Sequence, residues 1–251
     1  QGVEAEVVIF PEFTPALDNL EEHSHLWLLC WLHEAARDRL KVVPKRVKAS
    51  TEPKGVFSLR SPARPNPISL TASRLLKREG NRLFLANIDV IDGTPVLDIK
   101  PYSVGWDCIF SARNNSNYQI YQKLGRQEAL EDMLRQAANF HGGSCVGVSI
   151  GVRTAYFVLN HFGLSLQTKE LSCRAQARGC LADAVQSLMQ ANNKRFIRLE
   201  PQTGEFWFRY LNQELYLKIT PKKFYSIEEV MQASDEEMFA AIKETEVKSN
   251  A

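Results

Sequence analysis

Hydrophobic residues in the first half of the chain come in short runs separated by proline, glycine or asparagine. Alternation and β-branched content favour strands over helices in these runs. Gly80-Asn81 separates two of the runs and is a hairpin signal. The predicted strands are Ala5–Phe10, Leu26–Leu32, Ile68–Arg78, Arg82–Val90 and Pro95–Lys100. Leu26–Leu32 is unbroken and apolar, which is typical of a strand buried on both faces. The pattern predicts an all-β unit small enough to close as a barrel.

Helical periodicity begins only after Arg113–Asn117, a polar segment that we interpret as the linker between two domains. The predicted helices are Glu128–Phe140, Val146–Leu159 with Gly163 as its cap, Leu181–Met189 and Asp235–Lys243. Three alternating segments predict a small meander of strands: Lys194–Arg198, Glu205–Tyr210 and Glu214–Ile219. The predicted fold class is therefore an all-β barrel N-terminal domain, residues 1–112, followed by an α+β C-terminal domain, residues 120–251.

A proline-rich stretch, Gly55–Leu70, interrupts the predicted strands. Prolines 62, 65 and 67 each fix φ, lack a backbone donor and push the preceding residue towards extended conformations. We expect a stiff loop here, entered by a strand at Val56–Leu59. The loop carries Arg60, Arg64 and Asn66. Taken alone, its composition favours a rigid connector whose arginines face solvent.

The order of residues in this proline-rich stretch is distinctive. It reads Gly-Val-Phe-Ser-Leu-Arg-Ser-Pro-Ala-Arg-Pro-Asn-Pro-Ile-Ser-Leu, and residues 89–102 read Asp-Val-Ile-Asp-Gly-Thr-Pro-Val-Leu-Asp-Ile-Lys-Pro-Tyr. Together with Ser24-His25-Leu26-Trp27, these motifs resemble the TrmO (TsaA-like) family over about the first 110 residues. One departure is Ser69, where the family usually has glycine. The resemblance implies a β-barrel that binds S-adenosylmethionine and pairs as a homodimer.

The resemblance also implies an activity and a set of site residues. The activity is transfer of the cofactor's methyl group to N6 of threonylcarbamoyladenosine, next to the anticodon of certain tRNAs. Because the acceptor nitrogen is a poor nucleophile, a base that removes its proton is needed; we consider Asp92, Asp98 and His33, and favour Asp92 and His33. The implied cofactor-binding residues are Gln1, His33, Glu34, Arg60, Leu70, Asp92, Gly93, Thr94 and Pro95. Family members usually begin with one more strand, which ends in a Pro-Arg-Gln turn. We expect that Gln1 is the last residue of that turn and that part of the N-terminus precedes it. Without the resemblance, residues 92–95 are simply a good turn.

Charge is unevenly distributed along the 251 residues, although the net charge is only +2. Between Arg37 and Arg64 nine basic residues face two acidic ones, and the remainder of the chain is acidic. This basic segment is a candidate phosphate-facing patch and agrees with tRNA as the partner. No apolar run reaches the roughly 18–20 residues of a membrane span. Five cysteines without a Cys-x-x-Cys pair favour a reducing cytoplasm.

Two stretches of the second half, Phe140–Arg153 and Cys180–Gln186, resemble the core of FmdE-like domains, in which such residues can hold a metal. His141, Cys145 and Cys180 are the candidate ligands here. The second histidine of the family pattern is replaced by Gly143. We therefore expect no tightly bound metal, and a role in packing or in extending the nucleic-acid surface. In this interpretation the glycines allow helix packing and the cysteines are small hydrophobic residues. The alternative is a divalent-metal site at His141, Cys145 and perhaps Cys180.

The sequence thus predicts a cytoplasmic S-adenosylmethionine-dependent tRNA methyltransferase. A first alternative keeps the cofactor but methylates a small molecule. A second is a non-enzymatic regulatory protein that binds a metal or another ligand.

Overall fold

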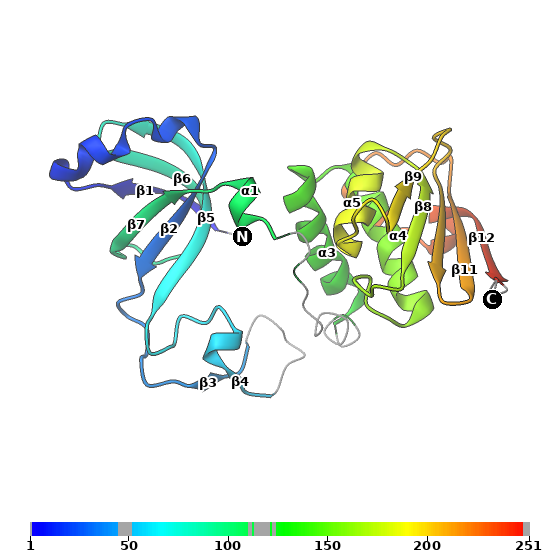
Figure 1. The fold of residues 1–251 in the computed structure, drawn as a ribbon, viewed down its shortest axis with the longest axis horizontal. Helices are drawn as coiled ribbons and strands as arrows, with labels where there is room; N and C mark the ends of the chain where they lie inside the picture. The colour runs from blue at the N-terminus through cyan, green and yellow to red at the C-terminus, as the bar shows by residue number, and fades with distance from the viewer. Residues whose placement is uncertain (1, 45–51, 110–111, 113–120, 122–123, 248–251) are drawn as a thin grey trace. The chain divides into compact units, whose positions relative to one another are not determined.

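The computed structural model describes residues 2–44, 52–109, 112, 121 and 124–247 (Figure 1). The chain divides into two compact units, Gln1–Ile109 and Phe110–Ala251. The predicted linker Arg113–Asn117 and the candidate residue Gln1 lie outside the described residues. Within the described ranges, every helix is too short or too polar to cross a membrane.

The first unit is built on a five-stranded antiparallel sheet with the strand order β1-β6-β5-β2-β7. Its strands are β1 (Val3–Val8), β2 (His25–Trp31), β5 (Ile68–Glu79), β6 (Arg82–Ile88) and β7 (Val96–Pro101). The short elements are the 3-10 helices η1 (Pro11–Leu17), η2 (Leu20–Glu22) and η3 (Val56–Ser58), the paired strands β3 (Lys41–Val42) and β4 (Lys54–Gly55), and α1 (Val104–Asp107). The all-β prediction is confirmed. In the described residues the sheet keeps β1 and β7 as separate edges, with no ladder that closes a barrel.

Period-two burial explains how this sheet forms. Leu26, Leu28 and Cys30 of β2 are buried and join Leu83 and Leu85 of β6 in one core. The residues of β2 between them are only half-buried, so the prediction of a strand buried on both faces was wrong. Their apolar character is still used, since the Trp27 ring lies 5.3 Å from that of Tyr102.

The predicted strand at Val56–Leu59 was also wrong, because η3 occupies this position. The hydroxyl of Ser58 donates to the carbonyl of Gly55 at 2.7 Å. A serine that bonds a carbonyl three residues back offers the backbone an alternative to a strand ladder. The entry to the proline-rich loop is therefore a tight turn.

The second unit is a mixed five-stranded sheet with its helices on one side (Figure 1). Its helices are α3 (Arg126–His141), α4 (Val146–Phe162), α5 (Gly179–Met189), α6 (Ile227–Gln232) and α7 (Asp235–Met238). Its strands are β8 (Ser172–Gln176), β9 (Phe196–Arg198), β10 (Glu205–Tyr210), β11 (Gln213–Ile219) and β12 (Phe239–Glu246), in the order β12-β11-β10-β8-β9. The α+β prediction is confirmed, including Gly163 as the left-handed cap of α4.

Two predictions in this unit were wrong. β9 pairs in parallel with β8, a strand that the sequence analysis missed, so the three predicted strands do not form a meander. The helix predicted at Asp235–Lys243 ends at Met238, and β12 follows it. Pairing along β11 and the Phe239–Phe157 ring contact at 5.0 Å override a weak helical preference.

Candidate functional site

The two motifs of the first unit meet at the end of β2. The backbone nitrogen of Leu32 donates to the carbonyl of Pro67 at 2.7 Å, and that of Trp31 donates to the carbonyl of Pro95 at 2.9 Å. The proline-rich loop and the 92–95 turn therefore flank this strand end, because they lead into its two neighbours, β5 and β7. His33 and Glu34 follow directly, so the sheet brings residues that are far apart in sequence to one end.

Residues 91–94 form a hydrogen-bonded turn. The amide of Thr94 donates to the carbonyl of Ile91 at 3.3 Å, and its hydroxyl donates to the same oxygen at 2.7 Å. Gly93 has φ of 72°, which a residue with a side chain rarely adopts. The turn leaves the side chain of Asp92 exposed to solvent. The hydrogen-bonded turn thus holds the carboxylate of Asp92 on a restrained backbone.

Two arginines outside the expected cofactor set hold the proline-rich loop. Nε of Arg37 donates to the carbonyl of Pro65 at 3.2 Å. The backbone nitrogen of Arg64 donates to the carbonyl of Ala36 at 3.0 Å. Their guanidinium groups lie 5.4 Å from the centroid of the Trp31 ring and 5.6 Å from that of Phe57, respectively. The sequence could show only that these arginines were present, whereas their partners come from the fold.

The remaining expected site residues lie at the surface. Nε2 of His33 is 3.9 Å from a carboxylate oxygen of Glu34. Arg60 is exposed, and Leu70 of β5 is 44% exposed and pairs with Leu29. Oδ2 of Asp98 is 2.8 Å from Nζ of Lys100, and this hydrogen bond lowers the pKa of Asp98. Because a lower pKa makes a weaker base, Asp98 is the least suited of the three candidates for general base.

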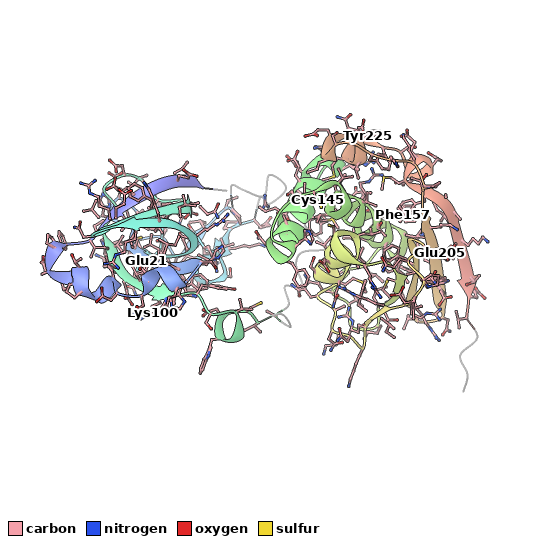
Figure 2. The ribbon with its side chains drawn as sticks, turned by 90° about the horizontal axis from the view of Figure 1, so that it is seen from above. Glu21, Lys100, Cys145, Phe157, Glu205 and Tyr225 are labelled. Atoms are coloured by element: carbon pink, nitrogen blue, oxygen red, sulfur yellow. The ribbon has the colours of Figure 1, made fainter. Side chains whose placement is uncertain are left out.

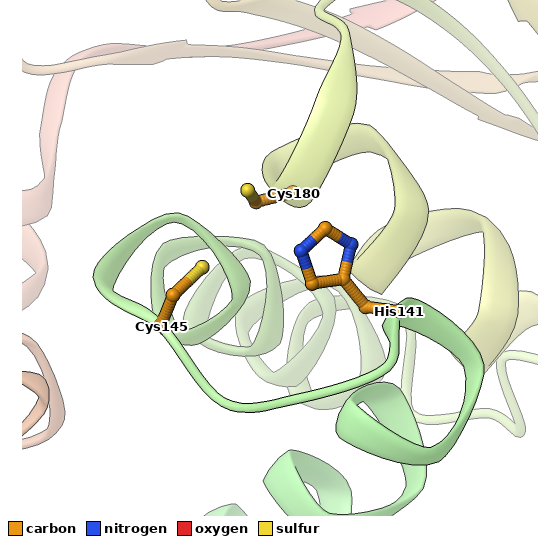
Figure 3. Close-up of side chains that lie close together, drawn as sticks. All are labelled: His141, Cys145 and Cys180. Atoms are coloured by element: carbon orange, nitrogen blue, oxygen red, sulfur yellow. The ribbon is translucent and has the colours of Figure 1, made fainter.

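The second unit brings its three candidate ligands together. One side-chain donor atom from each of His141, Cys145 and Cys180 lies within 4.8 Å of the others. They come from the end of α3, the N-cap of α4 and the first turn of α5, and the His141 ring faces the space beside the two thiols (Figure 3). The sequence analysis treated these residues as candidates but expected no tightly bound metal, an expectation that the geometry leaves untested.

Glycines allow this approach. Gly142 ends α3 with φ of 95° and turns the chain towards Cys145. A Cβ on Gly147 would lie 2.7 Å from Cβ of Cys180, so a larger residue would push the starts of α4 and α5 apart. At Gly143, in contrast, a Cβ would have no neighbour within 4 Å. Position 143 is exposed and has room for a side chain.

A second layer of polar residues orients His141. Nδ1 of His141 lies 3.1 Å from Oδ2 of Asp183, and Oδ1 of Asp183 accepts from Arg198 at 2.9 Å. A hydrogen bond with Cys145 raises the pKa of the Cys180 thiol, as expected where two sulfur atoms compete for one negative charge. Sequence reasoning missed the roles of Asp183 and Arg198; the only signal was the spacing of Asp183, three residues after Cys180 on one helix.

Comparison with known families divides the chain in the same way. Residues 1–108 match the model of the tRNA-methyltransferase O N-terminal domain, and residues 140–249 match FmdE, named for the molybdenum formylmethanofuran dehydrogenase operon. These matches confirm both resemblances that the motifs indicated. The FmdE match contains all three candidate metal ligands.

Individual relatives extend this result. A probable S-adenosyl-L-methionine-binding protein of Archaeoglobus fulgidus is 37% identical over 186 residues, which cover 72% of this chain and 49% of the relative. A second protein of that organism, named S-adenosyl-L-methionine-binding protein, is 45% identical over 105 residues, 42% of this chain and 73% of its own length. The tRNA (adenine(37)-N6)-methyltransferase of Mus musculus is 44% identical over 126 residues, 49% of this chain but 28% of the mouse protein. This chain thus spans about half the length of the first relative and less of the mouse enzyme.

A crystal structure titled TrmO from Pseudomonas aeruginosa aligns with 87% of this chain and 80% of its own, at 24% identity and a TM-score of 0.36, which is too low to carry an argument. The assignment rests instead on the family models and on the relative that this chain covers by 73% at 45% identity. The chain therefore belongs to the family defined by the tRNA-methyltransferase O N-terminal domain, and this domain is followed by a region that matches the FmdE family model.

Proposed function

We propose that this protein binds S-adenosylmethionine and transfers its methyl group to N6 of threonylcarbamoyladenosine, next to the anticodon of tRNA. The observation that carries the proposal is the junction at the end of β2, where Leu32 and Trp31 bind Pro67 and Pro95. It unites the two family motifs in a chain whose relatives include named S-adenosylmethionine-binding proteins and tRNA methyltransferases.

The residues at this strand end have the chemistry that the cofactor requires. S-adenosylmethionine supplies a methyl group on a positively charged sulfur and also carries a carboxylate, an amino group and an adenosine. Arg60 would pair with the carboxylate, and the side chains of Glu34 and Asp92 would accept hydrogen bonds from amino or hydroxyl groups. Leu70, at 44% exposure, would cover an apolar face, while residues 93–95 would offer backbone groups.

Catalysis would then rest on position and on one proton transfer. Holding the acceptor nitrogen in line with the methyl group removes several kcal/mol of barrier, roughly 7–11 kcal/mol in the best intramolecular cases. His33 or Asp92 would accept the N–H proton. An imidazole nitrogen can take up a proton, and the neighbouring carboxylate of Glu34 would stabilise the imidazolium that results. Asp98, already bound by Lys100, would stay ionised.

Three finer expectations belong to this proposal and rest on the family resemblance. They are closure of the first sheet into a barrel, pairing of two chains as a homodimer, and a cytoplasmic location. Methylation of a small molecule is the competing activity, and it would not require the basic segment. Mass spectrometry of purified protein tests the common part, because S-adenosylmethionine carried over from the cell supports both activities. If the purified protein carries no S-adenosylmethionine and does not bind it when it is added in solution, both activities are refuted.

A second function is favoured for the other unit. We infer that His141, Cys145 and Cys180 bind a divalent ion such as Zn²⁺, since their donor atoms lie within 4.8 Å of one another and Asp183 orients the histidine. Three protein ligands suit an ion that keeps one position for water or another ligand. Elemental analysis of the protein sample used for mass spectrometry tests this: stoichiometric zinc supports it, and no binding of added zinc contradicts it.

A further inference from the structure

One rank of side chains crosses the second sheet on the side away from the helices. Four consecutive Cα partners form it: Arg174 on β8, Trp207 on β10, Tyr216 on β11 and Lys243 on β12. The two rings have centroids 5.4 Å apart. The Arg174 guanidinium lies 5.9 Å from the Trp207 ring, and the Lys243 amino group lies 5.9 Å from the Tyr216 ring. Two adjacent aromatic rings thus have a cation on each side.

This sheet face is not covered by the described helices. Phe206 and Phe208 of β10 point to the helical side and are fully buried, so Trp207 between them points the other way. On β12, Glu244 pairs with His161 of α4, and therefore the preceding Lys243 lies on the open face. Figure 1 shows the helices on one side of the strands, and Figure 2 labels Glu205, which shares the open face, and Tyr225 beside α6.

Positive charge predominates around the two rings. Arg209 and Lys218 flank the rank on the same face, by the alternation of β10 and β11. The two carboxylates of the face are already engaged: Glu214 binds Arg174 at 2.8 Å, and Glu205 binds Lys218 at 3.1 Å. Four basic and two acidic side chains leave the face with a net positive charge.

We propose that this face binds a short stretch of single-stranded RNA. Trp207 and Tyr216 are partly exposed. A sheet with adjacent accessible aromatic rings stacks unpaired bases, and cations beside the rings meet the phosphates that follow. Trp207 and Tyr216 would each stack a base, while Lys243 and Arg174 would contact the backbone. The choice of RNA over another anionic aromatic ligand rests on the proposed function. A protein partner is the competing occupant, but charge complementarity favours a polyanion.

Fluorescence anisotropy with the full chain and labelled oligouridylate of about eight nucleotides tests this proposal. Trp207→Leu and Tyr216→Leu should each weaken binding at least about fivefold, since stacking of one base is worth roughly 1–3 kcal/mol. Trp207→Phe, which keeps a ring, should retain most of the affinity. Lys243→Gln should reduce the slope of log K against log salt by about 0.7, the contribution of one phosphate on a single strand.

Matched controls separate this face from the rest of the surface. Tyr225→Leu removes an aromatic side chain that is 82% exposed, and Lys223→Gln removes an exposed cation in the same segment; both variants should bind as the wild type does. Equal affinity of the wild type, Trp207→Leu and Tyr216→Leu would overturn the proposal, as would an absence of binding. Methyl transfer to tRNA, measured on the same samples, distinguishes the two proposals. If tRNA is methylated but the Trp207 and Tyr216 variants bind RNA as the wild type does, the proposed function stands and the RNA-binding face is refuted. If these variants lose RNA binding but no methyl transfer occurs, the RNA-binding face stands and the proposed function is refuted.

Discussion

Nδ1 of His141 lies 3.1 Å from Oδ2 of Asp183, whose other oxygen is held by Arg198. A carboxylate only accepts, so the proton of the neutral imidazole sits on Nδ1. Nε2 then keeps its lone pair, and this nitrogen points towards the two thiols (Figure 3). The fold therefore fixes the form of His141 that a metal requires.

Removal of this orienting carboxylate should weaken metal binding without abolishing it. Asp183→Asn should lower the affinity for Co²⁺ about 10–100-fold, the usual effect of losing such a partner. Cys145→Ser should cost more, because it removes a ligand. Titration with Co²⁺, followed by the thiolate-to-metal absorption band, measures both. Cys108→Ser, at an exposed cysteine of the first unit, is the control and should behave as the wild type. Absence of the band in wild-type protein would contradict the inferred metal site.

The cofactor site gives a second prediction. Arg60→Ala and Asp92→Ala should each weaken S-adenosylmethionine binding more than tenfold, because each removes a charged hydrogen bond worth about 1.5–3 kcal/mol. Both side chains are exposed, so the fold should survive. Titration calorimetry is the measurement. Arg82→Ala, which removes the ion pair with Glu6, is the control. Near-native affinity in both site variants would refute the assignment of these residues.

A third prediction concerns stability. Arg153 is 1% exposed and donates to the carbonyls of Val230 and Ala233 at 2.6 and 2.7 Å and to Asp235 at 2.9 Å. Burial lowers its pKa, while Asp235 opposes this shift. Arg153→Met keeps much of the volume but leaves the Val230 carbonyl without this donor, whereas Ala233 still accepts from Arg126; the change should cost about 1–3 kcal/mol.

Urea unfolding followed by helical circular dichroism measures this loss, since the longer helices belong to the second unit. Arg135→Met is the matched control. Arg135 is partly exposed and pairs with Asp132 on the same helix, so its loss should cost no more than about 1 kcal/mol. Equal midpoints for the two variants would show that the buried network contributes little.

The basic segment supplies a fourth prediction. Lys45, Arg46 and Lys48 lie outside the described residues, but Arg39 and Lys41 of the same segment are exposed. The double variant Arg39→Glu and Lys41→Glu should weaken tRNA binding and reduce its salt dependence, while affinity for S-adenosylmethionine stays unchanged. Filter binding at several salt concentrations measures the effect. If the wild type shows no salt-dependent tRNA binding at all, methylation of a small molecule becomes the better proposal.

Local patterns predicted most of the fold. The hairpin at Gly80-Asn81 and the cap at Gly163 depend on turn chemistry within a few residues, and both are confirmed. Elements that depend on distant partners were missed or mistaken. β12 forms because β11 offers an edge, and the parallel pairing of β8 with β9 depends on where α5 returns the chain. Neither relationship leaves a periodic signal in its own segment.

For the candidate sites, too, the sequence identified individual residues but not their contacts. Resemblance of the motifs to known families pointed to Arg60, Asp92 and His141, because motif positions can be read from the sequence. Their surroundings could not be read in this way. The contact of Arg37 with Trp31 and the bond from Arg198 to Asp183 join separate segments, and only the folded chain brings these groups together.

Methyl transfer itself tests the central claim most directly. The full chain should be incubated with S-adenosylmethionine and with tRNA that carries threonylcarbamoyladenosine, and the nucleosides should then be analysed by mass spectrometry. The account predicts one added methyl group on threonylcarbamoyladenosine, no product from tRNA that lacks this modification, and strongly reduced product with Asp92→Ala. An unchanged nucleoside profile from protein that is shown to bind S-adenosylmethionine would contradict it.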